Sequence, residues 1–172
     1  MFKTLFIFTL LLSTSSFAQD KHHAHNEAPY AGLQKREIKA LSEEQIKDLK
    51  SGKGMTLALA AELNGYPGPV HVLELADSLK LTSQQKQQTE ELFKTMSKET
   101  KALGLELIKD EKKLDLLFKN KKANTQNIKE ITLQIGQTQA KLRETHLRYH
   151  LSMVEILTFE QINFYNQLRG YK

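Results

Sequence analysis

The chain has 172 residues, a formal net charge of +5, and 26% charged residues. It contains no cysteine, which excludes a disulfide framework, a thiol nucleophile and a lipid attached through cysteine. Positive and negative charges alternate along the chain without a basic surface interrupted by aromatic residues, so we expect no nucleic-acid partner.

The first 18 residues have the pattern of a secretory signal. Lys3 precedes an apolar run over residues 5–12, and Ser16 and Ala18 place small residues where a signal peptidase reads them. The apolar run is far shorter than the roughly 20 residues that a membrane-spanning helix needs. We therefore expect cleavage after Ala18, export to the periplasm and no stable membrane insertion.

Residues 19–29 lack hydrophobic periodicity, and we interpret them as a disordered leader before a single helical domain over residues 30–172. The leader carries His22, His23 and His25, and clustered imidazoles bind zinc, copper or nickel. A flexible cluster would give weak scavenging at most, and a leader without any metal role is the alternative.

Three short helices are predicted before residue 80. The first begins at Ser42, where Gln45 three residues later completes a capping box, and it ends at two glycines. The second covers residues 55–63, which are rich in strong helix formers. After a Gly- and Pro-containing turn, a third helix is predicted over residues 70–79.

Two long helices follow, from Thr82 to about residue 119 and from about Thr125 to residue 157. Apolar residues repeat in each at intervals of three, four and seven, and a short polar turn joins them, which favours an antiparallel pair. We therefore predict an all-α fold, in which a long antiparallel helical hairpin carries short N-terminal helices and a short C-terminal helix. The repeating apolar residues are Leu92, Met96, Leu103, Leu107, Leu114 and Leu117 in the first helix, and Ile128, Ile131, Ile135, Leu142 and Tyr149 in the second.

The second long helix has a further apolar face, on the side opposite this seam. The short N-terminal helices could cover it, or it could be a homodimer interface or an open surface for apolar clients. Five residues make up this face: Leu133, Ala140, Leu147, Leu151 and Val154.

A leucine, a hydroxyl residue, two spacers and a glutamine occur three times. The copies begin at Leu41, Leu81 and Leu157, and the last two follow the stricter pattern Leu81-Thr82-x-x-Gln85 and Leu157-Thr158-x-x-Gln161. Each copy is a capping box with a hydrophobic residue before it, which is common at helix starts. Because the helices fold back on each other, Thr82 and Thr158 should lie at the same end of the hairpin.

With these motifs, the chain resembles the LTxxQ-motif family of periplasmic proteins, which includes Spy/CpxP-type chaperones and related heavy-metal sensor and zinc-resistance-associated proteins. The resemblance covers the signal, the hairpin and both strict motifs, roughly residues 70–170. It implies a small helical protein, often a dimer, that holds unfolding proteins without ATP or reports envelope stress or metals. The segment from Tyr30 to Gly68 is not explained by the motif.

His146 and His150 stand four residues apart on one face of the second long helix and could share a metal ion. Met153 could add a thioether ligand, and His71 is a further candidate. The family's metal sensors use histidine pairs at this spacing, but a second His-x-x-x-His is missing here. The alternative is that both histidines are packed, hydrogen-bonded residues beside the apolar seam.

Catalytic motifs are absent from the sequence: it has no Gly-x-Ser-x-Gly elbow, no HExxH pair and no phosphate-binding loop, so we predict a binding protein that needs no cofactor. The leading hypothesis is an ATP-independent chaperone for unfolded or envelope proteins. Apolar patches ringed by charge, including the lysines near residues 109–122, would suit it, although these lysines could merely solvate the hairpin tip. The alternatives are a metal sensor or metal-binding protein, and an accessory subunit with one dedicated partner.

Overall fold

The computed structural model describes residues 28–171, and every described element is helical. The chain divides into two units, residues 1–31 and 32–172, and every helix described within residues 28–171 belongs to the second. The predicted signal, the cleavage after Ala18 and the leader histidines His22, His23 and His25 lie outside the described residues. No helix within residues 28–171 combines the length and the hydropathy that a membrane crossing requires.

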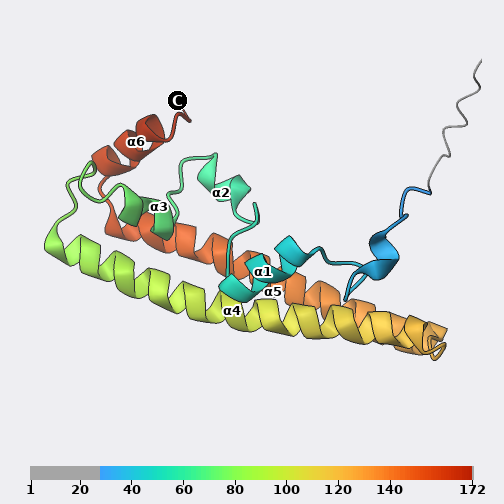
Figure 1. Cartoon of the computed structure of the whole chain (residues 1–172). Coiled ribbons are helices and arrows are strands. Elements are labelled where there is room, and N and C mark those ends of the chain that lie inside the picture. Colours follow the sequence, from blue (N-terminus) through green and yellow to red (C-terminus); the bar gives the residue numbers. More distant parts are fainter. Residues whose placement is uncertain (1–27, 172) are drawn as a thin grey trace, which may run out of the picture. The chain divides into compact units, whose positions relative to one another are not determined.

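The fold prediction is confirmed: two long helices pack antiparallel as a hairpin. Helix α4 runs from Ser83 to Lys119 and α5 from Thr125 to Ile156, so at about 1.5 Å per residue each is roughly 50 Å long. Figure 1 shows the pair side by side, with the short helices at one side and one end. The tight turn between the two helices has Lys121 in the left-handed region at φ 57°.

Two clusters of buried apolar residues hold the helices of this unit together. The cluster nearer the turn joins Ile131, Ile135 and Leu142 of α5 to Leu107 of α4 and to residues of the N-terminal segment. The second lies at the other end and surrounds Met153 and Tyr165, both 0% exposed. The predicted seam of the hairpin is therefore the core of the fold.

The short helices differ in part from the prediction. Helix α1 (Glu43–Ser51) begins at Ser42 with the predicted capping box, and α3 (Pro69–Glu74) is followed by turns through residue 80. The prediction of a helix over residues 55–63 is wrong for the first half of this range, because α2 covers only Leu59–Glu62. Met55 and Thr56 have φ of 42° and 66°, which no α-helix accommodates. A single 3₁₀ turn, η1, covers Leu33–Lys35.

Helix α1 lies against α4 at a glycine. A β-carbon on Gly104 would overlap the carbonyl oxygen of Leu49, so only glycine allows the two backbones to approach this closely. Nearby, the hydroxyl of the fully buried Thr100 donates to the Met96 carbonyl at 2.9 Å and lies 3.3 Å from the Gly52 carbonyl. These contacts fix the N-terminal segment along the hairpin, and Figure 1 shows α1 lying beside α4.

Helix α6 (Phe159–Leu168) closes the end of the hairpin where α4 begins, and the two strict motifs meet there. Thr82 and Thr158 each form the predicted capping box with their own glutamine. The two glutamines also bond each other, with Gln85 Nε2 2.8 Å from Gln161 Oε1 and Gln161 Nε2 3.1 Å from Gln85 Oε1. Each side-chain nitrogen additionally donates to a main-chain carbonyl before the opposite motif, at Ile156 or Leu79.

This arrangement, which we name the glutamine clasp (Gln85 and Gln161), gives the repeated motif a tertiary role. A capping box alone satisfies only the N–H groups of its own helix. Here the same amide groups also join α4 to α6 and to the end of α5. The expectation that Thr82 and Thr158 lie at the same end of the hairpin is confirmed.

Candidate functional site

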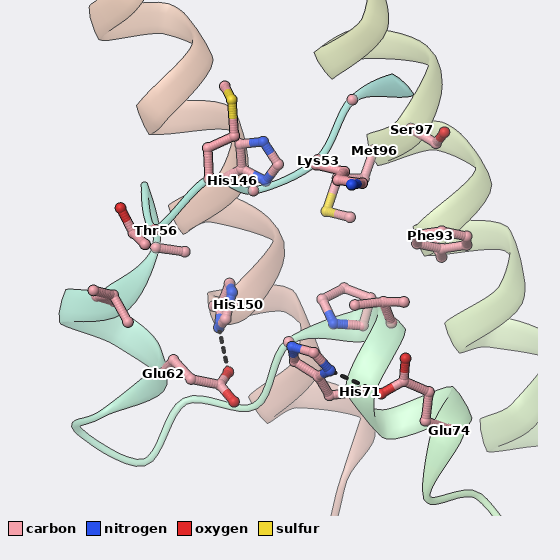
Figure 2. Close-up of a pocket in the computed structure, with 18 of the residues that line it drawn as sticks. Lys53, Thr56, Glu62, His71, Glu74, Phe93, Met96, Ser97, His146 and His150 are labelled. Atoms are coloured by element: carbon pink, nitrogen blue, oxygen red, sulfur yellow. Dashed lines mark hydrogen bonds and ion pairs between the residues drawn. The ribbon is translucent and has the colours of Figure 1, made fainter. Parts of the chain in front are cut away.

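A cavity of about 600 Å³ lies between the hairpin and the segment from Ser51 to Glu74. Its walls include Phe93 and Met96 of α4, and three of the histidines singled out from the sequence: His71, His146 and His150. Figure 2 shows His146 and His150 projecting from one helix toward the segment that carries Thr56 and Glu62. The i, i+4 spacing thus places both imidazoles on the same side of α5.

His150 is held by the turn between α2 and α3. Its Nδ1 lies 2.7 Å from the carbonyl oxygen of Tyr66, which can only accept, so Nδ1 carries the proton in the neutral ring. Oxygen Oε2 of Glu62 is 3.7 Å from the same nitrogen, as the dashed line in Figure 2 marks. Nitrogen Nε2 of His150 is left with its lone pair, beside Gly68.

His146 is 4% exposed, and its Nε2 has no hydrogen-bond partner within the described part of the chain. Burial lowers the pKa of this imidazole below its ordinary value, and the nearby His150 lowers it further. The ring is therefore kept neutral at neutral pH. A neutral imidazole with a free nitrogen is the form that binds metals or accepts a hydrogen bond.

His71 belongs to α3 and is half-buried at the cavity wall. Its Nδ1 lies 2.9 Å from Oε2 of Glu74, so the carboxylate accepts from this nitrogen and Nε2 is free. Met153, the fourth predicted ligand, is 0% exposed in the second core cluster and does not line the cavity. Within residues 28–171, no three His, Asp or Glu side chains lie close enough together to hold a metal ion.

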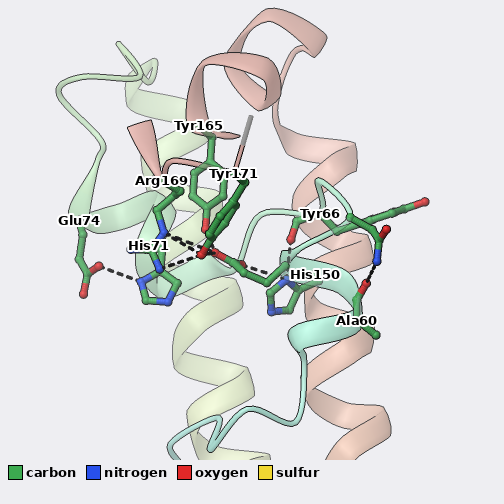
Figure 3. A network of polar contacts seen from close by, with 10 residues as sticks. Ala60, Tyr66, His71, Glu74, His150, Tyr165, Arg169 and Tyr171 are labelled. Atoms are coloured by element: carbon green, nitrogen blue, oxygen red, sulfur yellow. Dashed lines mark hydrogen bonds and ion pairs between the residues drawn. The ribbon is translucent and has the colours of Figure 1, made fainter. Parts of the chain in front are cut away.

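A buried carboxylate organises the far wall of the cavity. Oxygen Oε1 of Glu62 accepts from the hydroxyls of Tyr165 at 2.5 Å and Tyr171 at 3.1 Å, and Arg169 Nε lies 3.5 Å away. Burial, followed by the contact with Glu62, raises the pKa of Tyr165, so this phenol stays protonated and donates. Figure 3 shows the side chains of Tyr165, Arg169 and Tyr171 gathered between His71 and His150.

This network ties α2 to α6, and the sequence analysis missed it. Glu62 and its partners are more than one hundred residues apart along the chain. The only local signal was a carboxylate in a stretch of apolar residues, from Leu57 to Leu63. Oxygen Oε2 of Glu62 is buried without a hydrogen-bond partner among residues 28–171.

The second apolar face predicted for α5 lies outside the core. Leu133 is 61% exposed, Leu151 57% and Val154 36%, while Ala140 is exposed and Leu147 is half-buried. The short N-terminal helices therefore leave most of this face uncovered. Of the alternatives that the sequence left open, coverage by these helices does not apply to most of the face. We call these five residues the outer face of α5.

Comparisons of the chain with family models, curated proteins and solved structures gave no match. The resemblance to the LTxxQ-motif family therefore depends on the motifs quoted above.

Proposed function

We propose that the protein is an exported, periplasmic, ATP-independent chaperone that binds unfolded or envelope proteins on the outer face of α5. One observation carries this proposal: a row of exposed apolar side chains, Leu133, Ala140, Leu151 and Val154, runs along one helix. At about 1.5 Å per residue the row is roughly 30 Å long. Exposed apolar side chains gathered on one face of a helix are a feature of protein-binding surfaces.

The surroundings of the outer face favour loose and reversible binding. Exposed charged residues of both signs, such as Lys129, Glu130, Arg143 and Glu144, stand on the same helix beside the apolar positions. An apolar strip bordered by solvated charges buries little surface per client segment, so clients can leave without an energy source. The resemblance to Spy/CpxP-type proteins supports the same function, as does the absence of a phosphate-binding loop from the sequence.

The outer face is also where a homodimer would form if two copies of the chain associate. A second copy would bury the same side chains on both protomers, since a twofold interface uses one patch twice. Sedimentation velocity over a range of concentrations measures this association directly. A monomer–dimer equilibrium that weakens when Leu133 and Leu151 become serine would assign the face to dimerisation.

The direct test is the aggregation of a chemically unfolded client diluted into buffer with the purified mature chain, EDTA and no nucleotide. We expect light scattering to be suppressed at near-stoichiometric amounts of the chain. An equal amount of an inert helical protein serves as the control. Unchanged scattering at several-fold molar excess would contradict the proposal.

Metal binding at the cavity is the second candidate function. The observation that favours it is that His71, His146 and His150 line one cavity and that each has a ring nitrogen without a partner among residues 28–171. In two of them the other nitrogen is fixed by an oxygen acceptor, a pattern usual for metal-binding histidines. A metal would have to draw these side chains closer together than they lie in the structure.

Titration calorimetry with zinc, copper and nickel tests this candidate. A variant with His22, His23 and His25 changed to alanine removes binding by the leader. On that background, His146→Ala/His150→Ala should abolish the remaining heat if the cavity binds metal. Equal heats with and without the second pair of substitutions would exclude the cavity.

A further inference from the structure

The tip of the hairpin, residues 109–124, carries a concentration of positive charge that the proposed chaperone function does not use. From Leu116 to Lys129 the chain has four lysines and no acidic residue. Lys119, Lys121 and Lys122 are all exposed in the turn that joins α4 to α5. Hydrogen bonds that involve no carboxylate fix this turn, including Asn127 Nδ2 to the Lys122 carbonyl at 2.9 Å.

Most carboxylates within and beside the tip are paired or buried; among residues 28–171 the half-buried Glu111 forms no ion pair, and the exposed Glu130 accepts from Gln126 at 2.7 Å. Glu37 accepts from Lys112 at 2.8 Å, and Asp115 lies 3.6 Å from Lys39. Asp110 is 2% exposed and accepts from Gln134. Among residues 28–171, no carboxylate lies within ion-pair distance of the remaining lysines of the tip: Lys109, Lys113, Lys119, Lys121 and Lys122.

Beside these lysines lies a shallow groove of about 380 Å³ with an apolar floor. Leu116 and Leu117 form the floor, Asn120 lies at one end, and the remaining lining residues are four lysines: Lys109, Lys112, Lys113 and Lys122. Lysines three and four residues apart on a helix repel one another, so their spacing is unfavourable unless an anion is near. Lys112 is paired with Glu37, but the other three lysines of the groove have no ion-pair partner within residues 28–171, so the groove combines apolar surface with unneutralised positive charge.

Apolar side chains are exposed on more than one side of the tip. Leu116 is 41% exposed and Phe118 is 54% exposed. Two residues apart on a helix, they point about 200° apart, so nothing that lies along one side of α4 can cover both. A bound peptide would contact one side, whereas the headgroup layer of a bilayer can surround a helical tip.

We propose that the tip of the hairpin docks on the surface of an anionic lipid bilayer. Lys119, Lys121 and Lys122 bind the lipid phosphates, while Phe118 and Leu116 enter the boundary between headgroups and acyl chains. Lysines near an anionic surface and an exposed aromatic side chain are the usual elements of such peripheral binding. The contact is peripheral and differs from the insertion of a membrane-spanning helix.

Co-sedimentation of the mature chain with vesicles tests the proposal. We compare vesicles of phosphatidylcholine alone with vesicles that also contain phosphatidylglycerol, at low and at high salt. Binding should require phosphatidylglycerol and should weaken with salt. Equal binding to both kinds of vesicle, or no binding to the anionic ones at low salt, would overturn the proposal.

Matched variants locate the contact on the molecule. Changing Lys119, Lys121 and Lys122 to glutamine should weaken binding about 100-fold, given the usual contribution of each lysine at an anionic surface. The control is the same change at three exposed lysines near the other end of α4, which should weaken binding only a few-fold: Lys86, Lys94 and Lys98. If both triple variants weaken binding equally, net charge rather than the tip is responsible and the proposal fails.

The apolar part of the contact has its own pair of variants. Phe118→Ser should weaken binding roughly 10-fold, because the ring no longer leaves water. Phe159→Ser removes a ring that is 73% exposed at the start of α6, and this control should bind like the wild type. Circular dichroism of each variant confirms that the helices are intact.

Competition with polyglutamate distinguishes the bilayer from an acidic polypeptide. Displacement from vesicles by excess polyglutamate, together with unchanged vesicle binding by Phe118→Ser, would show that the tip binds acidic polymers through charge alone and would overturn the proposal. Without vesicles, the lysine variant should suppress client aggregation as the wild type does. The vesicle experiment therefore tests membrane docking independently of the chaperone function.

Discussion

The two apolar faces of α5 contain the same kinds of side chain and lie in opposite environments. On the inner face Ile131 is 1% exposed and Leu142 is 3% exposed, while on the outer face Leu133 and Leu151 are 61% and 57% exposed. The inner face is covered by α4 and the N-terminal segment, and nothing in residues 28–171 covers most of the outer one. Helical periodicity thus locates apolar faces, but the rest of the fold decides which of them becomes core.

The inner face should be the larger contributor to stability, and Leu142→Ala tests this. Removing a buried leucine side chain typically costs about 2–5 kcal/mol of the free energy of unfolding, because a cavity replaces the lost contacts. Leu133→Ala on the outer face should change that free energy by at most about 0.5 kcal/mol. Urea unfolding followed by circular dichroism measures both. Equal losses for the two variants would mean that the outer face is also packed in solution.

The next largest loss of stability should come from breaking the glutamine clasp, which joins α4 to α6 and to the end of α5. Gln161→Ala removes the half of the capping box that accepts from the Thr158 N–H, and it also removes the bonds to Gln85 and Leu79, which together should cost about 2 kcal/mol. Gln45 forms the same capping box at Ser42 without bonds to a second motif, so Gln45→Ala should cost only about 0.5–1 kcal/mol.

A double-mutant cycle separates the clasp from the two local caps. Because Gln85 and Gln161 bond each other directly, their substitutions should be coupled by at least about 0.5 kcal/mol. Gln45 and Gln161 share no contact in the structure, and their substitutions should be additive. Additivity in both cycles would reduce the repeated motif to a set of independent helix caps.

A smaller loss of stability is expected when the pH falls, because His146 is buried in its neutral form at the edge of the inner face. The pKa of His146 is lowered by burial and by His150, so the unfolded chain takes up a proton at a pH where the folded chain does not. The contribution of the neutral His146 ring to the free energy of unfolding is therefore fully present above pH 6.5, the ordinary pKa of histidine. That contribution is lost as the pH falls below this value. His146→Gln should reduce the difference in urea midpoint between about pH 7.5 and pH 5.5. An unchanged difference would show that His146 is accessible to protons in the folded state.

Local sequence patterns were sufficient to predict the framework of the fold. The three predicted capping boxes, at Ser42, Thr82 and Thr158, depend on residues three apart, so a sequence that forms the helix also forms the cap. The seam of the hairpin follows from the seven-residue repeat in the same way. Tertiary contacts overrode helix propensity at residues 55–58, where Met55 and Leu57 turn toward the first core cluster.

The contacts that shape the candidate sites could not be predicted from local patterns. The bond between Gln85 and Gln161 and the network around Glu62 each join residues more than seventy positions apart. The sequence suggested that His71, His146 and His150 were candidates, but only the fold places them on one cavity. It also included Met153, which was expected on the same side of the helix as His146 and His150, whereas the structure places it in the core.

The most direct test of the chaperone proposal removes the outer face without disturbing the inner one. Leu133→Ser/Leu151→Ser is compared with Leu63→Ser/Leu105→Ser, which removes two leucines that are 56% and 53% exposed elsewhere. In the client aggregation assay with EDTA and no nucleotide, the control variant should match the wild type, and the outer-face variant should need several-fold more protein for equal suppression. Equal suppression by both variants would contradict the assignment of client binding to the outer face of α5.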